Sequence, residues 1–247
     1  MEPRSAPLLE PRQRWRLTVG RTADAPELSQ RDTFAAWDEA IAAAGLPGWT
    51  GDATKPKPRL SFGAPLSVGM VAEAELIDVL LTERWPAWRV REALGPRVPE
   101  GWTIVDLADV WLGGPPLAGR VVAAEYRLTL EGDPSGPTDR PATGAAVTTA
   151  ARTLLAARSL PRERAKGDGT VRYDLRPLLV DIAVVDDGPP VTIRIRTRFH
   201  PELGTGRPEE VVLAIADELG SPLAIDSIVR ERLVLADDPR PADSGST

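Results

Sequence analysis

The sequence predicts an α+β fold made of a tandem pair of ferredoxin-like βαββαβ units, which together form one extended antiparallel sheet with helices on one face. The first observation is an internal repeat, in which the pattern WRLTVG at residues 15–20 returns as YRLTLEG at residues 126–132. Two weaker matches follow in the same order: GLP with SLP, and IVD with AID. They begin at residues 45 and 159, and at residues 104 and 224. The second observation is that both halves show the same succession of strand and helix patterns.

Six elements are expected in the first half. Residues 14–20 alternate as a strand does, and residues 32–44 carry apolar side chains at helical spacing before a closing glycine. Further strands are expected at residues 59–62, 73–83 and 102–112, and a helix beginning with proline at residues 86–94.

The second half repeats this order. Strands are expected at residues 121–131, within 170–185, at 191–199 and at 228–235, and helices at residues 144–158 and 208–219. The clearest strand is 191–199, where Val191, Ile193 and Ile195 alternate with polar residues. The last helix has proline in its first turn and glycine after its end.

A glycine- and proline-rich joint at residues 113–116 separates the halves. We therefore place the first ferredoxin-like half at residues 12–117 and the second at 118–236. The ends, residues 1–11 and 237–247, are expected to be flexible tails.

Composition excludes several kinds of chemistry. The 247 residues include no cysteine, so iron–sulfur ligation, disulfides and thiolate catalysis are excluded. His200 is the single histidine, so a site with two histidine ligands is excluded as well. We predict no cofactor and no metal. No apolar run is long enough to span a bilayer and the first residues lack the apolar centre of a secretion signal, which favours a cytoplasmic protein without membrane contact.

Basic residues are the candidates for binding. The net charge is −6, yet only three of the 30 basic residues are lysines, and the arginine guanidinium suits phosphate and carboxylate. A genome of high GC content, which favours arginine codons, would also explain the preference for arginine over lysine. The candidate substrate- or anion-binding residues lie at the edges of expected elements: Lys57, Arg59, Arg164, Lys166, Arg176, Arg207 and Arg230.

Acidic residues give weaker candidates. Asp174, in the motif DLRP at residues 174–177, is either a general base or nucleophile beside a cation, or a structural partner of Arg176. Glu73 and Glu75 are expected on one side of a strand and Asp78 on the other, which weakens a magnesium site and favours a solvated edge strand.

The same segments resemble a known family. Residues 45–47 (GLP), 58–66 (PRLSFGAPL), 68–69 (VG) and 73–78 (EAELID), with 174–177 (DLRP) and 207–209 (RPE), resemble the radical-SAM-linked domain of unknown function over nearly the whole chain. Members of that family are fused to, or encoded beside, radical SAM proteins with a B12-binding-type domain. Two positions depart from the family pattern, because Gln30 and Lys57 stand where the family has histidine.

This resemblance implies a function by association. It implies that the chain is a non-catalytic accessory or substrate-binding partner of a radical SAM enzyme, with RNA or another phosphate-bearing substrate. Two alternatives remain open: an RNA-modifying enzyme of pseudouridine-synthase type that uses Asp174, and a protein–protein scaffold.

Overall fold

The computed structural model describes residues 10–50, 60–132, 143–166 and 169–238. The chain forms two compact units, Met1–Arg120 and Val121–Thr247. The division falls three residues after the boundary expected from the glycine–proline joint. Most of the two predicted tails lies outside the described residues, as do Lys57 and Arg59.

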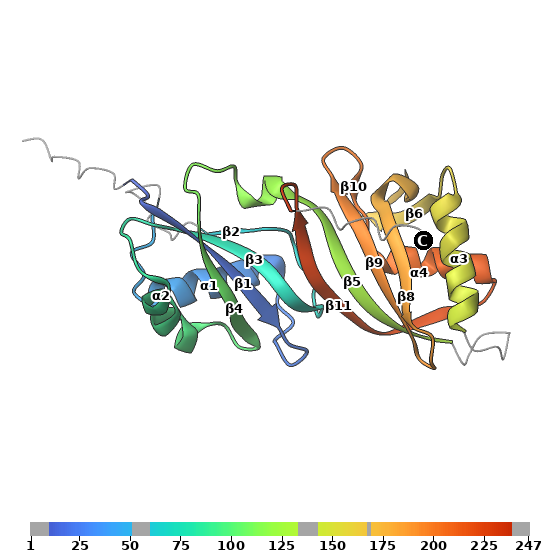
Figure 1. The fold of residues 1–247 in the computed structure, drawn as a ribbon, viewed down its shortest axis with the longest axis horizontal. Coiled ribbons are helices and arrows are strands. Elements are labelled where there is room, and N and C mark those ends of the chain that lie inside the picture. Colours follow the sequence, from blue (N-terminus) through green and yellow to red (C-terminus); the bar gives the residue numbers. More distant parts are fainter. Residues whose placement is uncertain (1–9, 51–59, 133–142, 167–168, 239–247) are drawn as a thin grey trace, which may run out of the picture. The chain divides into compact units, whose positions relative to one another are not determined.

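The first unit has the element order β-α-β-β-α-β. Its elements are β1 (Gln13–Arg21), α1 (Gln30–Ala43), β2 (Leu60–Phe62), β3 (Val71–Leu81), α2 (Ala87–Leu94) and β4 (Trp102–Val110), with short 3-10 turns at Gly95–Arg97 and Leu117–Arg120. The strands are antiparallel in the order β4-β1-β3-β2 (Figure 1). Helix α1 begins where the Ser29 side chain accepts a hydrogen bond from the Asp32 amide.

The core of the first unit lies on one face of this sheet. Alternate apolar residues of β1 and β3 belong to one buried cluster, and both helices contribute to it. Helix α1 adds Trp37, whose ring meets Trp102 of β4 edge to face at 5.7 Å between centroids. Because α1 and α2 share one cluster with the strands, both cover the same face of the sheet.

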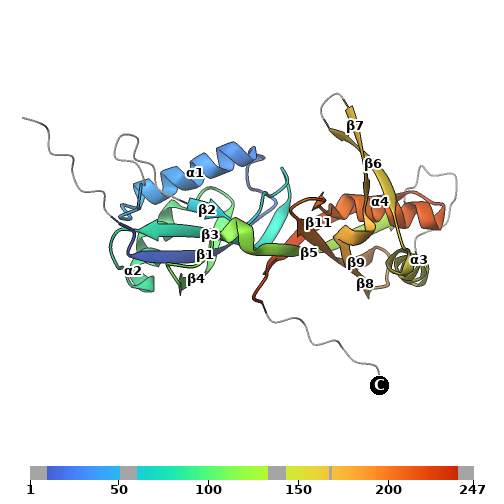
Figure 2. The same cartoon turned by 90° about the horizontal axis from the view of Figure 1, so that it is seen from above.

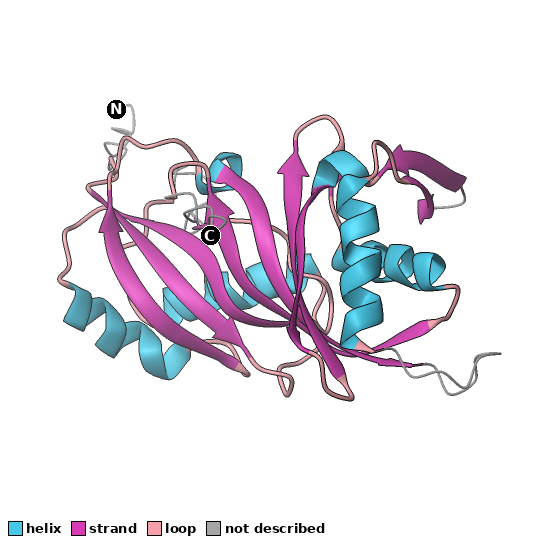
Figure 3. Cartoon of the chain, turned by 45° about the vertical axis from the view of Figure 1, so that its right-hand side comes forward, coloured by secondary structure: helices cyan, strands magenta, loops and turns pink. Residues whose placement is uncertain are grey.

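The second unit has the same order with an insertion. Its elements are β5 (Val121–Gly132), α3 (Gly144–Ala156), β6 (Pro161–Lys166), β7 (Gly169–Asp174), a 3-10 turn (Arg176–Leu178), β8 (Leu179–Asp186), β9 (Val191–His200), β10 (Gly204–Thr205), α4 (Pro208–Leu219) and β11 (Leu223–Leu235). The main strands are antiparallel in the order β11-β5-β9-β8. Helices α3 and α4 pack against each other and cross (Figure 3).

The insertion is the hairpin β6–β7, which extends away from the sheet of the second unit (Figure 2). Sequence analysis missed β6 and merged β7 and β8 into one region. The hairpin sequence PRERAK is polar on both faces, so it lacks the alternation that marks a strand packed on a core.

Both units are therefore mixed α and β, and the order of strands in their sheets is the same. The repeated patterns fall on β1 and β5, where Trp15 and Tyr126 are buried. Among the residues that the structure describes, no helix has the length and apolar character needed to cross a membrane.

Candidate functional site

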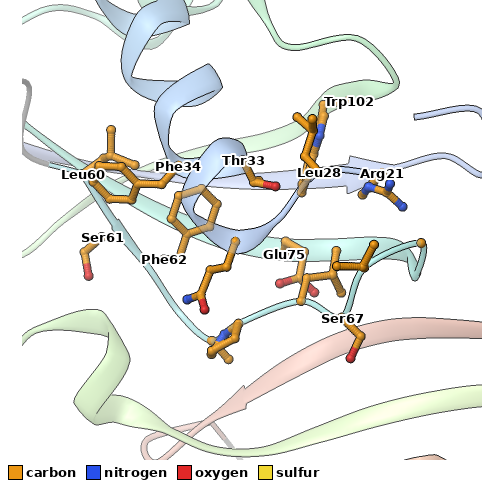
Figure 4. A pocket seen from close by; sticks show the side chains of 16 residues that line it. Arg21, Leu28, Thr33, Phe34, Leu60, Ser61, Phe62, Ser67, Glu75 and Trp102 are labelled. Atoms are coloured by element: carbon orange, nitrogen blue, oxygen red, sulfur yellow. The ribbon is translucent and has the colours of Figure 1, made fainter. Parts of the chain in front are cut away.

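A cavity of the first unit lies beside the start of α1. Its volume is about 280 Å³, and it is enclosed by the segment before α1, the first turn of α1, β2 and the loop that follows β2 (Figure 4). Most of its wall is apolar: Leu28, Phe34, Leu60, Phe62, Leu66, Val68 and Trp102. Polar side chains are fewer: Arg21, Gln30, Thr33, Ser61, Ser67 and Glu75.

Arg21, the last residue of β1, fixes the two loops that wall this pocket. It is buried, and its guanidinium donates to the carbonyl oxygens of Met70 at 2.9 Å, Ala25 at 3.1 Å and Pro26 at 2.9 Å. Charge-assisted bonds to carbonyl groups of two separate loops hold both loops against the end of β1. The loop after β2 also turns through Gly69 with φ +75°, a conformation that favours glycine.

Glu75 forms part of the pocket's inner wall. It lies opposite Val19 on the same face of the sheet as Ile77, Val79 and Leu81, and only 2% of it is exposed. The expected solvated edge strand is therefore wrong: β3 lies between β1 and β2, and the inward alternation that buries its apolar residues also buries this carboxylate.

Asp78, on the other face of β3, is also buried, because two arginines of β1 surround it. Its carboxylate accepts hydrogen bonds from Arg14 Nε at 2.7 Å and from Arg16 Nε at 2.7 Å and Nη2 at 3.0 Å. Arg14 also donates to the carbonyl oxygens of Gly114 and Pro115, which anchors the joint to the sheet. Because the carboxylate and both guanidiniums are buried and hydrogen-bonded within the unit, this network is structural.

The pocket offers hydrogen bonds that its own residues leave unused. Among the described residues, no hydrogen bond engages the side chains of Gln30, Thr33, Ser61 or Ser67. Phe34 and Phe62 lie 6.0 Å apart between ring centroids with their planes at 45°. An apolar or planar group with a few neutral hydrogen-bonding atoms fits such a wall.

Two charged side chains, Arg21 and Glu75, line the described wall of this pocket. Within the described parts of the chain, no three histidine, cysteine, aspartate or glutamate residues gather in a way that could hold a metal ion. Among the described residues of the wall there is no histidine or lysine, and Glu75 is the one common type of general base.

The predicted anion-binding residues that the structure describes differ in their surroundings. Arg164 lies on β6 with its guanidinium 5.0 Å from the ring centre of Tyr173, and Lys166 ends that strand. Arg207 is exposed at the start of α4, whereas Arg230 of β11 is 2% exposed.

The guanidinium of Arg176 is bound to backbone carbonyl groups. It donates to the carbonyl oxygens of Leu155 at 2.7 Å, Ala157 at 3.2 Å and Leu179 at 2.9 Å. Two of these carbonyls belong to the end of α3, where helices leave acceptors unpaired. Arg176 therefore joins the end of α3 to the start of β8.

Asp174 also makes backbone contacts. Its Oδ1 accepts from the amides of Leu160 at 2.7 Å and Arg176 at 2.9 Å. Burial raises the pKa of this carboxyl group, but the hydrogen bonds from Leu160, Arg176 and Ser159 outweigh burial, so the pKa is lowered from 3.8. These contacts favour the structural interpretation of the DLRP motif, although the expected partner was the Arg176 side chain and the observed one is its amide.

Sequence analysis did not identify the pocket residues as a site. One signal was available: residues 60–62 and 64–66 of a family-like segment border the cavity, as does Gln30, one of the two departures from the family pattern. Their joint location depends on the pairing of β2 with β3, which single-sequence periodicity does not specify.

Comparison with known proteins identifies a family. The sequence pattern of a bacterial family, described as "Uncharacterized protein conserved in bacteria (DUF2344)", matches residues 14–208. No curated protein matches. A solved chain from the "Crystal structure of the archaeal box H/ACA sRNP Nop10-Cbf5 complex" is similar with 12% identity and a TM-score of 0.42. That similarity covers 87% of the present chain, which spans about half (47%) of the solved one.

Proposed function

Because this chain belongs to the uncharacterized bacterial family DUF2344, we propose that it is a non-catalytic, substrate-binding partner of a radical SAM enzyme, and that the pocket of the first unit receives part of the substrate. The observation that carries this proposal is the pocket itself, with an apolar wall and four polar side chains that no described residue engages.

The chemistry of the wall argues for recognition. A largely apolar pocket with a small number of polar atoms is suited to orient a ligand. A cavity of about 280 Å³ accommodates a group of roughly the size of a nucleoside or smaller, so a larger substrate would insert only one group. The reacting centre would then be supplied by the partner.

The nature of the partner and substrate comes from the resemblance. Part of the first-half sequence that resembles the radical-SAM-linked family borders the pocket, namely residues 60–62, 64–66 and 68–69 with Glu75. We propose RNA, or another phosphate-bearing molecule, as the substrate, and the cytoplasm as the place of action.

The strand order also supports a proposal on the fold. When the four main strands of each unit are numbered in chain order, both sheets have the order 4-1-3-2. All neighbouring strands in this order are antiparallel. This is the arrangement of the split βαββαβ unit. We propose that each unit is a ferredoxin-like unit and that the second carries the β6–β7 hairpin as an insertion.

A complementation experiment tests the function. A native-host strain lacking the gene is complemented with wild type, with Ser67→Trp, which places an indole at the pocket rim, or with Ala35→Trp, a control on an exposed position of α1. Modified nucleosides in digested RNA are compared by mass spectrometry, and each tagged protein is purified to identify bound partners.

The expected result is that a nucleoside absent from the deletion strain returns with wild type and Ala35→Trp but not with Ser67→Trp, while a radical SAM protein co-purifies with all three. The proposal fails if no radical SAM protein co-purifies, or if Ser67→Trp restores the nucleoside as fully as wild type does.

A further inference from the structure

The second unit presents a row of arginines on the face of its sheet opposite the core. Along β9, Ile193 and Ile195 point into the core, so Arg194, Arg196 and Arg198 point the other way. Arg127 of β5 lies directly opposite Arg194, and Arg232 of β11 lies opposite Glu125 of β5. Five guanidinium groups thus gather on adjacent strands.

Two carboxylates hold four of these guanidiniums in place. Glu231 pairs with Arg127 and, at 2.6 Å, with Arg194. Glu125 pairs with Arg196 and, at 2.7 Å, with Arg232. Each carboxylate is shared by two arginines, so the four guanidiniums outnumber these two carboxylates.

The carboxylates lie beneath the guanidiniums. The side chains of Glu125 and Glu231 are 12% and 11% exposed, whereas those of Arg194 and Arg232 are 49% and 41% exposed. A ligand that approaches this face therefore meets arginine N–H groups first. Two further carboxylates lie at its margins: Asp181 of β8 opposite Arg196, and Asp238 at 3.8 Å from Arg232.

Arg198 differs from the other four. It is exposed, it lies opposite Ala123, and no described residue makes a hydrogen bond or ion pair with its guanidinium. Arg198 thus extends the row of arginines along β9, and no described carboxylate forms an ion pair with it. Removing it should therefore leave the fold unchanged.

The spacing fits a polyanion better than a single phosphate group. From Arg194 to Arg198 the strand advances four residues, or roughly 13 Å at ~3.3 Å per residue. The neighbouring arginines widen the face by about one strand spacing, ~4.8 Å, on to β5. Guanidiniums that are already positioned by carboxylates lose less conformational freedom when they bind phosphate.

A row of hydroxyl groups adjoins the arginines. Thr192 of β9, Thr129 of β5 and Ser227 of β11 lie opposite one another across the three strands. A hydroxyl can donate to or accept from the ribose 2′-hydroxyl, the group that distinguishes RNA from DNA. We propose that this arginine face, consisting of Arg127, Arg194, Arg196, Arg198 and Arg232 with the adjoining hydroxyl row, binds the backbone of single-stranded RNA.

This inference deepens the proposed function, on which it rests for the choice of RNA as substrate, but it uses a surface of the other unit. The test is fluorescence anisotropy of a labelled 12-nucleotide single-stranded RNA with the full chain, over a series of salt concentrations. Arg198→Gln and Arg198→Glu are compared with Arg152→Gln, which removes the same charge from an exposed position of α3.

We expect wild type and Arg152→Gln to bind within twofold of each other. Arg198→Gln should weaken binding several-fold and reduce the slope of log K against log salt by about 0.7, the value for one phosphate contact on a single strand. Arg198→Glu should weaken it further, and thermal unfolding of both variants should match wild type. DNA of the same sequence should bind more weakly than RNA.

The inference is overturned if the RNA is not bound at low salt, if Arg198→Gln behaves like Arg152→Gln, if DNA binds as tightly as RNA, or if anionic lipid vesicles bind and RNA does not. Ser67→Trp should bind the 12-mer as wild type does. If Arg198→Gln and Arg198→Glu bind RNA as Arg152→Gln does, while Ser67→Trp fails to restore the nucleoside as expected, the arginine face is rejected as an RNA site. The proposal for the pocket then remains.

Discussion

Glu75 and Val191 occupy equivalent positions in the two sheets. Glu75 lies opposite Val19, four residues after Trp15 in β1, and Val191 lies opposite Leu130, four residues after Tyr126 in β5. Both are almost fully buried. The second unit fills this position with an apolar side chain, whereas the first places a carboxylate there, at the wall of its pocket.

The first prediction concerns the buried charges on the other face of β3. Asp78→Asn should lower the free energy of unfolding by about 3–5 kcal/mol, because Arg14 and Arg16 would stay buried without their counter-ion. Urea denaturation measures this. Asp106→Asn, at an exposed position of β4, should change stability by less than about 0.5 kcal/mol. Equal effects of the two variants would show that the network is not structural.

Arg176→Gln should also destabilise the protein, by about 2–3 kcal/mol, because carbonyl oxygens at the end of α3 and at Leu179 lose their donors. Thermal and urea unfolding measure the loss, and Arg152→Gln on α3 serves as the control with the same charge change. If Arg176→Gln unfolds as wild type does but loses RNA binding, Arg176 belongs to an anion site after all.

The lowered pKa of Asp174 predicts a pH dependence. Its folded-state pKa lies below that of the unfolded chain, about 3.9, so its ionised form stabilises the fold above that pH. This contribution is lost as the pH falls through the folded-state value. Asp174→Asn should therefore be less stable than wild type at pH 7, and the gap should close below about pH 4. Urea unfolding between pH 7 and pH 3 tests this, and a constant gap would contradict it.

The same variant separates the structural role of Asp174 from a catalytic one. Asp174→Asn keeps an oxygen that can accept the amides of Leu160 and Arg176, so the protein should fold and restore RNA modification in the deletion strain. A folded but inactive variant would instead favour the pseudouridine-synthase type of activity.

Arg21 predicts a local effect on the pocket. Arg21→Met should raise hydrogen–deuterium exchange in residues 22–28 and 63–70, because the loops lose their shared donor, and leave exchange in α2 unchanged. Arg31→Met, at an exposed position of α1, is the matched control. Unchanged exchange in both loops would mean that other contacts fix the pocket wall.

Local signals predicted much of the fold. Helix α4 was placed at its observed bounds because proline at the start and Gly220 in the left-handed conformation at the end mark both limits. Strand β9 was placed from its alternation. Strand β6 was missed because its polar residues on both faces give no period, and β7 was merged with β8 into one region.

The sites were harder to predict because they depend on which strands become neighbours. The alternation that placed Val191, Ile193 and Ile195 inward also places Arg194, Arg196 and Arg198 outward, so that row was within reach of the sequence. Its carboxylate partners were not, since they follow from the pairing of β5 with β9 and β11. The burial of Arg230 and Glu75 likewise depends on distant residues.

The identical strand order of the two units has an evolutionary consequence. A gene that encodes the same small architecture twice can keep the apolar interior of each copy while the remaining positions diverge independently. One copy could then specialise in enclosing a chemical group and the other in gripping a long charged chain. Mutations that change one unit would leave the other undisturbed.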